Sequence, residues 1–200
     1  MAGKLRLTGK MAIIGKKMLK TVCQILDENK IIYNLDNGTL LGIIREDRLL
    51  PWDNDIDITI HEKYLPQLLK LRWKFWLAGY RTRLRYSKID IKYFPKGKIR
   101  MMKIQTRKFF FKGSNMIELY FKVEDNDKYY YIEDEKDPVL KAASAKYYKN
   151  LIRHNFDDYE YLIPKDYEEY LVFRYGDWKT PNKEFNYKKD DLAIVNPKEQ

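Results

Sequence analysis

Between Asp53 and Ile60 the sequence alternates strictly between two kinds of side chain. Asp53, Asp55, Asp57 and Thr59 occupy the odd positions, and isoleucines occupy positions 56, 58 and 60. Because successive side chains of a strand point to opposite faces, the segment predicts a strand with one acidic face and one apolar face. Three carboxylates on one face repel one another, so this strand needs a compensating cation.

The acidic face of this strand has the donor chemistry of a metal site. Carboxylates at i and i+2 of a strand lie about 7 Å apart at Cα and face the same side. Oxygen ligands of this kind suit Mg²⁺ or Mn²⁺. We therefore predict Asp53, Asp55 and Asp57 as metal ligands, with compensation by Lys and Arg, or a solvated polar strand, as the alternatives. A calcium loop that starts at Asp53 is excluded, because it would place Ile58 where Gly is required.

A Gly-Thr turn precedes the acidic strand and predicts a phosphate site. Gly38 allows close approach of the backbone to a ligand. Thr39 is expected to cap a helix that runs through "LLGIIRE" and ends at Pro51. The N-terminus of such a helix attracts phosphate, and Arg45 on the same helix is placed to bind phosphate in a bidentate manner.

The hydrophobic pattern predicts an α/β (α+β) fold in which helices flank a mixed sheet. Helices are expected over about 10–29, over the segment that follows His61, from 138 to 153 and from 166 to 175. In the second of these, Leu68, Trp73 and Trp76 share the apolar face, and Gly79 is the expected stop. Strands are expected at 31–35 and within 80–123, with turns at 95–98 and 112–115. We interpret residues 1–200 as a single domain with a helical C-terminal part from about 138.

Composition and single residues exclude several classes of function. Cys23 is the only cysteine, so no intrachain disulfide forms, and its apolar neighbours indicate a buried small side chain. His61 and His154 are not near a nucleophile pattern, and the sequence contains no P-loop and no Cys-x-x-Cys pair.

No apolar run is long enough to span a membrane. The net charge of +10 favours anionic partners, including an anionic membrane surface that the basic N-terminus contacts peripherally.

Two segments together carry a resemblance to a known family. "DNGTLLGIIREDRLLPWDNDIDI" (36–58) and "EEYLVFRYGDWKTP" (168–181) resemble the motifs of the LicD and fukutin-related family. That family belongs to the nucleotidyltransferase superfamily, so the resemblance implies a nucleotidyltransferase-like mixed sheet. Whether the second motif only packs Trp178 or also borders the active site stays open.

The resemblance also implies two site residues on later strands. The family has a lysine-bearing strand, which corresponds to Lys103 in "KIQ", and a further acidic residue, usually Asp, which corresponds to Glu118 in "MIELYF". Asp90 in "KIDIKY" is the rival for this acid, and we favour Glu118 because its distance from the C-terminal motif fits better. Glu118, Asp55 and Asp57 are thus the expected catalytic residues, and Gly38, Thr39, Arg45 and Lys103 are expected to bind the donor.

The resemblance implies a metal-dependent transferase that moves an alcohol phosphate from a CDP-linked donor to a glycan hydroxyl. Transfer of a nucleoside monophosphate from an NTP is an alternative on the same fold. A non-enzymatic nucleic-acid-binding protein is a second alternative, but three carboxylates repel phosphate unless metal intervenes, so no stable nucleic-acid partner is expected. The expected location is the cytoplasm, with contact at the periphery of a membrane.

Overall fold

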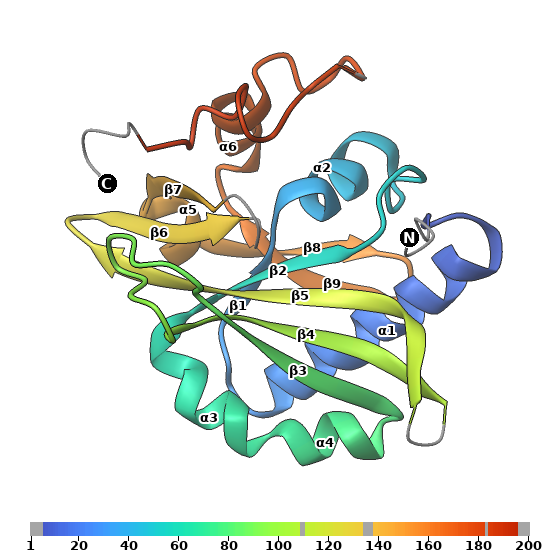
Figure 1. Ribbon diagram of the computed structural model, residues 1–200. Helices are drawn as coiled ribbons and strands as arrows, with labels where there is room; N and C mark the ends of the chain where they lie inside the picture. The colour runs from blue at the N-terminus through green and yellow to red at the C-terminus, as the bar shows by residue number, and fades with distance from the viewer. Residues whose placement is uncertain (1–5, 109–110, 134–137, 183, 196–200) are drawn as a thin grey trace.

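A mixed β-sheet forms the centre of the computed structural model, which describes residues 6–108, 111–133, 138–182 and 184–195 (Figure 1). The strands follow the order β1-β2-β5-β4-β3, and β6 and β7 continue from the far end of β5. Strands β2 and β5 are parallel, and the other pairs are antiparallel. The strand bounds are Tyr33–Leu35 (β1), Ile56–His61 (β2), Tyr80–Tyr86 (β3), Ile99–Lys108 (β4), Phe111–Asp125 (β5), Lys128–Glu133 (β6) and Val139–Ser144 (β7).

Helices cover one face of this sheet and build the core against it. Figure 1 shows α1 (Gly9–Glu28), α3 (Leu65–Lys70) and α4 (Arg72–Leu77) on the same side. The isoleucines of β2 are fully buried in this core, together with Met18 and Leu19 of α1. Cys23 is buried here as predicted, and burial raises the pKa of its thiol. The side chains that alternate with these isoleucines, among them Asp57 and Thr59, project from the opposite face of the sheet.

The remaining elements surround the ends of the sheet. These are α2 (Asn37–Glu46), η1 (Glu62–Tyr64), α5 (Lys146–Lys149), the hairpin of β8 (Leu151–Phe156) and β9 (Tyr159–Pro164), and α6 (Tyr167–Tyr175). The last helix, its stop at Gly176 and the stop at Gly79 agree with the prediction, and both glycines have positive φ. In the part of the chain that the structure describes, no helix has the length and apolar character needed to cross a membrane.

The acidic strand is shorter than its sequence pattern suggests. β2 begins at Ile56, so Asp57 lies on the strand whereas Asp53 and Asp55 lie in the segment before it. The helix α2 likewise ends at Glu46, not at Pro51, because Asp47 adopts a left-handed conformation with φ 50° and terminates it. The alternation still places Asp55 and Asp57 on the same side of the chain.

Several predicted elements differ from the structure. Trp73 and Trp76 are 58% and 48% exposed, and Phe75 takes the core position of α4 because the chain changes direction between α3 and α4. Residues 89–94 form only one isolated bridge, and the predicted turn at 112–115 lies within β5. The predicted helix over 138–153 is instead β7, α5 and part of β8. All six residues of β7 pair with β6, so cross-strand pairing decided the structure of this segment.

Candidate active site

Two carboxylates from neighbouring strands form the centre of the site. Asp57 of β2 and Glu118 of β5 are directly paired Cα partners, so their side chains emerge from the same face of the sheet. Both residues are buried, with 7% and 4% of their surface exposed. Asp53 and Asp55, from the segment before β2, join them in lining one cavity of about 760 Å³. The structure thus brings together the four acids that were predicted as metal ligands or catalytic residues, Asp53, Asp55, Asp57 and Glu118.

The charge of these acids is only partly compensated. Burial, followed by the charges of Glu118 and Asp53, raises the pKa of Asp55 to about 8. Burial is also the main reason why the pKa values of Asp53 and Asp57 are raised, and for Asp57 the charges of Asp55 and Asp53 add to it. The cavity wall therefore concentrates negative charge that a bound cation would stabilise.

Glu118 has two partners of its own. Lys103 is its directly paired residue on β4, and the Lys103 ammonium forms an ion pair with the Glu118 carboxylate. The hydroxyl of Tyr120 donates a hydrogen bond of 3.0 Å to Glu118 Oε2. Lys103 itself does not line the cavity. Its position favours a role in holding Glu118 rather than direct contact with a bound donor.

The rival acid, Asp90, lies elsewhere. It is exposed, and its Oδ1 accepts a hydrogen bond of 2.8 Å from the backbone N–H of Lys96 in the connection between β3 and β4. It is not among the residues that line the cavity. The geometry therefore favours Glu118 as the acid that accompanies Asp57.

The N-terminus of α2 forms the side of the cavity that faces the acids. The N-cap is Asp36, whose side chain accepts a hydrogen bond from the Asn37 N–H, so the prediction that Thr39 caps this helix is wrong. Thr39 lies inside the first turn, where its hydroxyl accepts a 2.8 Å hydrogen bond from the Asp57 N–H. It does not line the cavity, and it ties α2 to β2 instead.

Gly38 does line the cavity, and it meets a candidate metal ligand at close range. A Cβ atom at Gly38 would lie 2.3 Å from Asp53 Oδ2, so no larger residue fits without moving that carboxylate. Glycine is thus needed here for the close approach of Asp53, in addition to any approach of a ligand to the backbone.

Arg45 reaches the cavity from the last turn of α2. Its Nη1 donates a 3.1 Å hydrogen bond to the backbone oxygen of Trp178, and its Nη2 lies 2.7 Å from Glu46 Oε1. The side chain is 9% exposed. Arg45 therefore connects α2 to the segment after α6, and this connection places its guanidinium at the wall of the cavity.

The C-terminal segment forms the opposite wall. Trp178 is 6% exposed and belongs to the hydrophobic core. It also lines the cavity, so its motif both packs Trp178 and borders the candidate active site. The other lining residues of this segment are Tyr175, Asp177, Thr180, Pro181, Asn182, Phe185, Tyr187 and Asp191. Apart from the motif itself, sequence reasoning did not find this wall.

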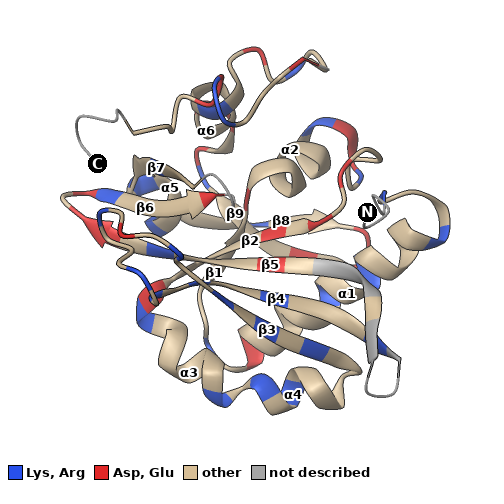
Figure 2. Cartoon of the chain, viewed as in Figure 1, with Lys and Arg blue, Asp and Glu red and all other residues tan. Residues whose placement is uncertain are grey.

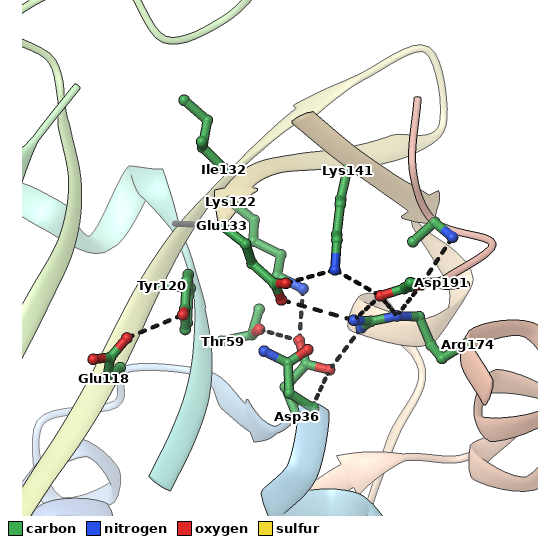
Figure 3. Close-up of polar contacts among 12 residues, drawn as sticks. Asp36, Thr59, Glu118, Tyr120, Lys122, Ile132, Glu133, Lys141, Arg174 and Asp191 are labelled. Atoms are coloured by element: carbon green, nitrogen blue, oxygen red, sulfur yellow. Dashed lines mark hydrogen bonds and ion pairs between the residues drawn. The ribbon is translucent and has the colours of Figure 1, made fainter. Parts of the chain in front are cut away.

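A network of six buried charges anchors these walls (Figure 3). Asp36 accepts a 2.6 Å hydrogen bond from Lys122, and Arg174 of α6 binds Asp191 through Nε and Nη2. Lys141 contacts both Glu133 and Asp191, at 2.5 and 2.8 Å. The hydroxyl of Tyr170 links Asp36 to Arg174, because it donates a hydrogen bond to Asp36 and accepts one from Arg174. The three acids and three bases balance, which suits full burial. Asp36, Tyr170 and Arg174 belong to the two family motifs, but their partners Lys122, Glu133, Lys141 and Asp191 lie outside them, so the motifs did not indicate the network.

The carboxylate oxygens that line the cavity are the candidate ligands for the expected metal ion. Among the residues that the structure describes, no three Asp, Glu, His or Cys side chains are grouped closely enough to form a finished metal site. The chemistry of the set nevertheless suits Mg²⁺ or Mn²⁺, because buried carboxylates with raised pKa values line one wall. Asp53, Asp55 and Asp57 are the residues that would hold the ion.

A mixed sheet with carboxylates on paired strands and a glycine-bearing helix start defines this chain as an α/β protein of the nucleotidyltransferase-like class. Its sequence matches the family described as LicD/FKTN/FKRP, nucleotidyltransferase domain, over residues 30–166. The chain belongs to this family.

Individual relatives share shorter parts of the sequence. An uncharacterised protein of Rickettsia prowazekii (strain Madrid E) is 39% identical over 77 residues, which are 38% of this chain and 29% of that protein. The lipopolysaccharide cholinephosphotransferase LicD of Haemophilus influenzae (strain ATCC 51907 / DSM 11121 / KW20 / Rd) is 46% identical over 37 residues, which are 18% of this chain and 14% of that protein. The chain thus spans less than a third of the length of these curated relatives.

Solved structures show a distant likeness. The lincosamide antibiotic adenylyltransferase LnuA, solved with lincomycin, has a TM-score of 0.47 and 14% identity, and the match covers 80% of this chain and 85% of that chain. ANT(2")-Ia in complex with adenylyl-2"-tobramycin has a TM-score of 0.44 and 12% identity, and covers 86% and 81% of the two chains.

Proposed function

We propose that this protein is a metal-dependent transferase that moves an alcohol phosphate from a CDP-linked donor to a glycan hydroxyl. The observation that supports it is the placement of Asp55, Asp57 and Glu118 in one cavity with the N-terminus of α2. Family membership supports transferase chemistry. The similarity to a lipopolysaccharide cholinephosphotransferase supports phosphocholine as the first alcohol phosphate to test, with ribitol phosphate as the next.

The donor phosphates would bind between α2 and the acids. Gly38 exposes backbone at the helix N-terminus, where the positive end of the helix dipole favours phosphate. Arg45 adds a fixed guanidinium on the same wall. When bound to Asp53, Asp55 and Asp57, Mg²⁺ or Mn²⁺ would neutralise charge on the bridging phosphates. Thr39 keeps β2 at a constant distance from this helix through its bond to Asp57.

Glu118 is proposed as the general base. In the transfer step the acceptor hydroxyl oxygen forms a bond to the phosphorus of the alcohol phosphate, and the bond from that phosphorus to the bridging oxygen of CMP breaks. Glu118 takes the hydroxyl proton, and CMP leaves with the bonding electron pair. The ammonium of Lys103 and the hydroxyl of Tyr120 hold Glu118 in position.

A second function, transfer of a nucleoside monophosphate from an NTP, uses the same carboxylates on the same fold. The two are distinguished by the product, since the proposed reaction releases CMP and nucleotidyl transfer releases pyrophosphate. Nucleic-acid binding is disfavoured because the cavity wall is acidic. We also propose that the protein works in the cytoplasm and touches anionic membrane at its periphery.

The decisive experiment offers the purified protein CDP-choline, CDP-ribitol, CDP-glycerol and the four NTPs, each with Mg²⁺ or Mn²⁺ and a panel of glycans. Metal-dependent release of CMP, with the alcohol phosphate recovered on a glycan, supports the proposal. Release of pyrophosphate assigns nucleotidyl transfer instead. Calorimetry with each nucleotide supplements this test, and absence of nucleotide binding by the metal-loaded protein would reject both functions.

A further inference from the structure

Positive charge is concentrated in one part of the chain. Residues 63–108 contain 15 Lys and Arg residues and a single acid, Asp90, although the whole chain carries a net charge of only +10. This segment forms α3, α4, β3 and β4, so the charge gathers at one edge of the sheet. Figure 2 shows basic residues along β3 and β4 and acidic residues on the neighbouring β5 and β2.

The strand register aligns these charges in a single row. Asp57 of β2 pairs with Glu118 of β5, Glu118 pairs with Lys103 of β4, and Lys103 pairs with Arg83 of β3. Directly paired residues project from the same face of a sheet, and neighbouring strands are about 4.8 Å apart. Arg83 therefore lies on the catalytic face, roughly 10 Å along the row from Glu118 by the same spacing.

The side chains of β3 divide cleanly between its two faces. Thr82 and Leu84 face the helices, since Thr82 Oγ1 accepts a 2.7 Å hydrogen bond from Arg72 and Leu84 packs against the core. Arg81 and Arg83 must then project from the other face, the one that carries Glu118. Arg83 is exposed and Arg81 is half-buried. Within the described residues, the guanidinium of neither arginine has a hydrogen bond or an ion pair with another protein group.

Protection of an edge strand is a simpler explanation for these arginines. Charged side chains on an edge strand discourage pairing with another chain. That role needs no particular register and no link to the active site. Here the arginine row continues directly into Lys103 and Glu118, and it supplies guanidinium groups that match the geometry of phosphate and carboxylate.

We propose that Arg81 and Arg83 form an acceptor subsite that binds an anionic group, a phosphate or a carboxylate, on the glycan acceptor. This inference rests on the proposed function and names the acceptor class. The anionic group binds at the edge strand β3 while the acceptor chain lies along the sheet face, so that its hydroxyl reaches Glu118. The spacing between Arg83 and Glu118 fits an acceptor in which charge and reacting hydroxyl are on different sugar units.

The test measures binding without any transfer reaction. The full chain, labelled with ¹⁵N, is titrated with glucose 6-phosphate, glucuronate and glucose at low salt, with and without saturating CMP, and amide shifts are mapped by NMR. We expect shifts in β3 and β4 for the anionic sugars and none for glucose, with CMP leaving them unchanged. A stronger response to one anionic sugar identifies phosphate or carboxylate as the group bound.

Variants make the assignment specific. Arg83→Gln should weaken binding of the preferred sugar by roughly tenfold, the loss of one charged hydrogen bond, and Arg83→Lys should weaken it less. Arg72→Gln removes the same charge on the helical side and should leave the affinity unchanged. Arg81→Gln provides a second variant at the proposed subsite.

Three outcomes would overturn the subsite. In the first, the amide shifts map to the start of α2 and disappear with CMP. In the second, Arg72→Gln and Arg83→Gln weaken binding of the anionic sugar equally. In the third, neither anionic sugar binds. Because none of these measurements uses the donor reaction, a failed subsite and a failed transferase assignment are distinguishable. A protein that binds the anionic sugars at β3 but releases no CMP from any CDP-linked donor would retain the subsite and lose the proposed chemistry.

Discussion

Asp57 and Glu118 are directly paired on the parallel strands β2 and β5, which fixes their carboxylates side by side on the face of the sheet that lines the candidate active site. The two residues are 61 positions apart in the chain, and the register of one strand pair sets their relation. Lys103 and Thr39 reinforce the arrangement from either side, the first by pairing with Glu118 and the second by binding the Asp57 N–H.

Asp55→Asn should lower kcat by about 10²-fold or more, because loss of a charged metal ligand costs several kcal/mol of transition-state stabilisation. The fold should survive, since the apolar face of β2 is unchanged. Turnover of the CDP-linked donor at saturating Mg²⁺ is the measurement. Asp90→Asn is the matched control and should retain wild-type activity, because Asp90 lies outside the cavity. Near-wild-type turnover by the Asp55 variant would remove Asp55 from the ligand set.

Glu118→Gln should abolish transfer while the affinity for the donor changes by no more than about 1 kcal/mol, the pattern of a group that acts on chemistry rather than on ground-state binding. Single-turnover kinetics and calorimetry with the same donor separate the two quantities. If donor affinity falls together with the rate, Glu118 is a ligand of the metal or the donor, and the base must be sought elsewhere.

Arg45→Ala should weaken donor binding by roughly 1.5–3 kcal/mol, the range for a hydrogen bond to a charged group. Calorimetry with the CDP-linked donor gives the value. Arg48→Ala is a suitable control, because Arg48 binds the same Glu46 but its side chain is 54% exposed. Equal donor affinity in both variants would mean that Arg45 serves only to tie α2 to Trp178.

Addition of Mg²⁺ or Mn²⁺ should raise the Tm of the wild-type protein, because the ion relieves repulsion among acids whose pKa values burial and mutual charge have raised. At a metal concentration of 100 Kd the expected stabilisation is about 2.7 kcal/mol. Thermal melts with and without EDTA measure it. Asp55→Asn should show a smaller rise, and an unchanged wild-type Tm over a wide metal range would argue against the site.

Acid should destabilise the protein through Asp36. Although burial alone raises the pKa of an acid, Lys122 and Arg174 hold the pKa of Asp36 well below its ordinary value. A group with a depressed folded-state pKa contributes stability above its unfolded value of about 3.9, and this contribution is lost progressively as the pH falls below about 5. Chemical unfolding of the wild-type protein between pH 7 and pH 3 measures the loss.

Lys122→Met tests the same network at neutral pH. Removal of one partner from a buried pair should cost about 3–5 kcal/mol, because the carboxylate of Asp36 remains buried. Lys146→Met is the control, since Lys146 forms an exposed pair with Glu169, and its loss should cost far less stability than the loss of Lys122. A Lys122 variant as stable as the control would show that other donors compensate Asp36 fully.

Local patterns in the sequence determined the acidic segment, the glycine turn before it, the first and last helices and the class of fold. The alternation of polar and apolar side chains and the helical spacing of apolar side chains both depend only on neighbours in the chain. For this reason β2, α1 and α6 can be predicted from the sequence alone. The family motif added Glu118 and Lys103. Even so, Thr39 was misread as a cap, because only the fold shows that Asp36 holds that position.

The tertiary structure decided everything that depends on distant pairing. Residues 139–144 became a strand because β6 lies beside them, and Trp73 and Trp76 are exposed because a bend between α3 and α4 turns Phe75 inward. The buried charge network joins residues from Asp36 to Asp191, and the row from Asp57 to Arg83 crosses four strands. Strand register and burial arise from contacts between segments remote in the chain, so no local pattern carries them.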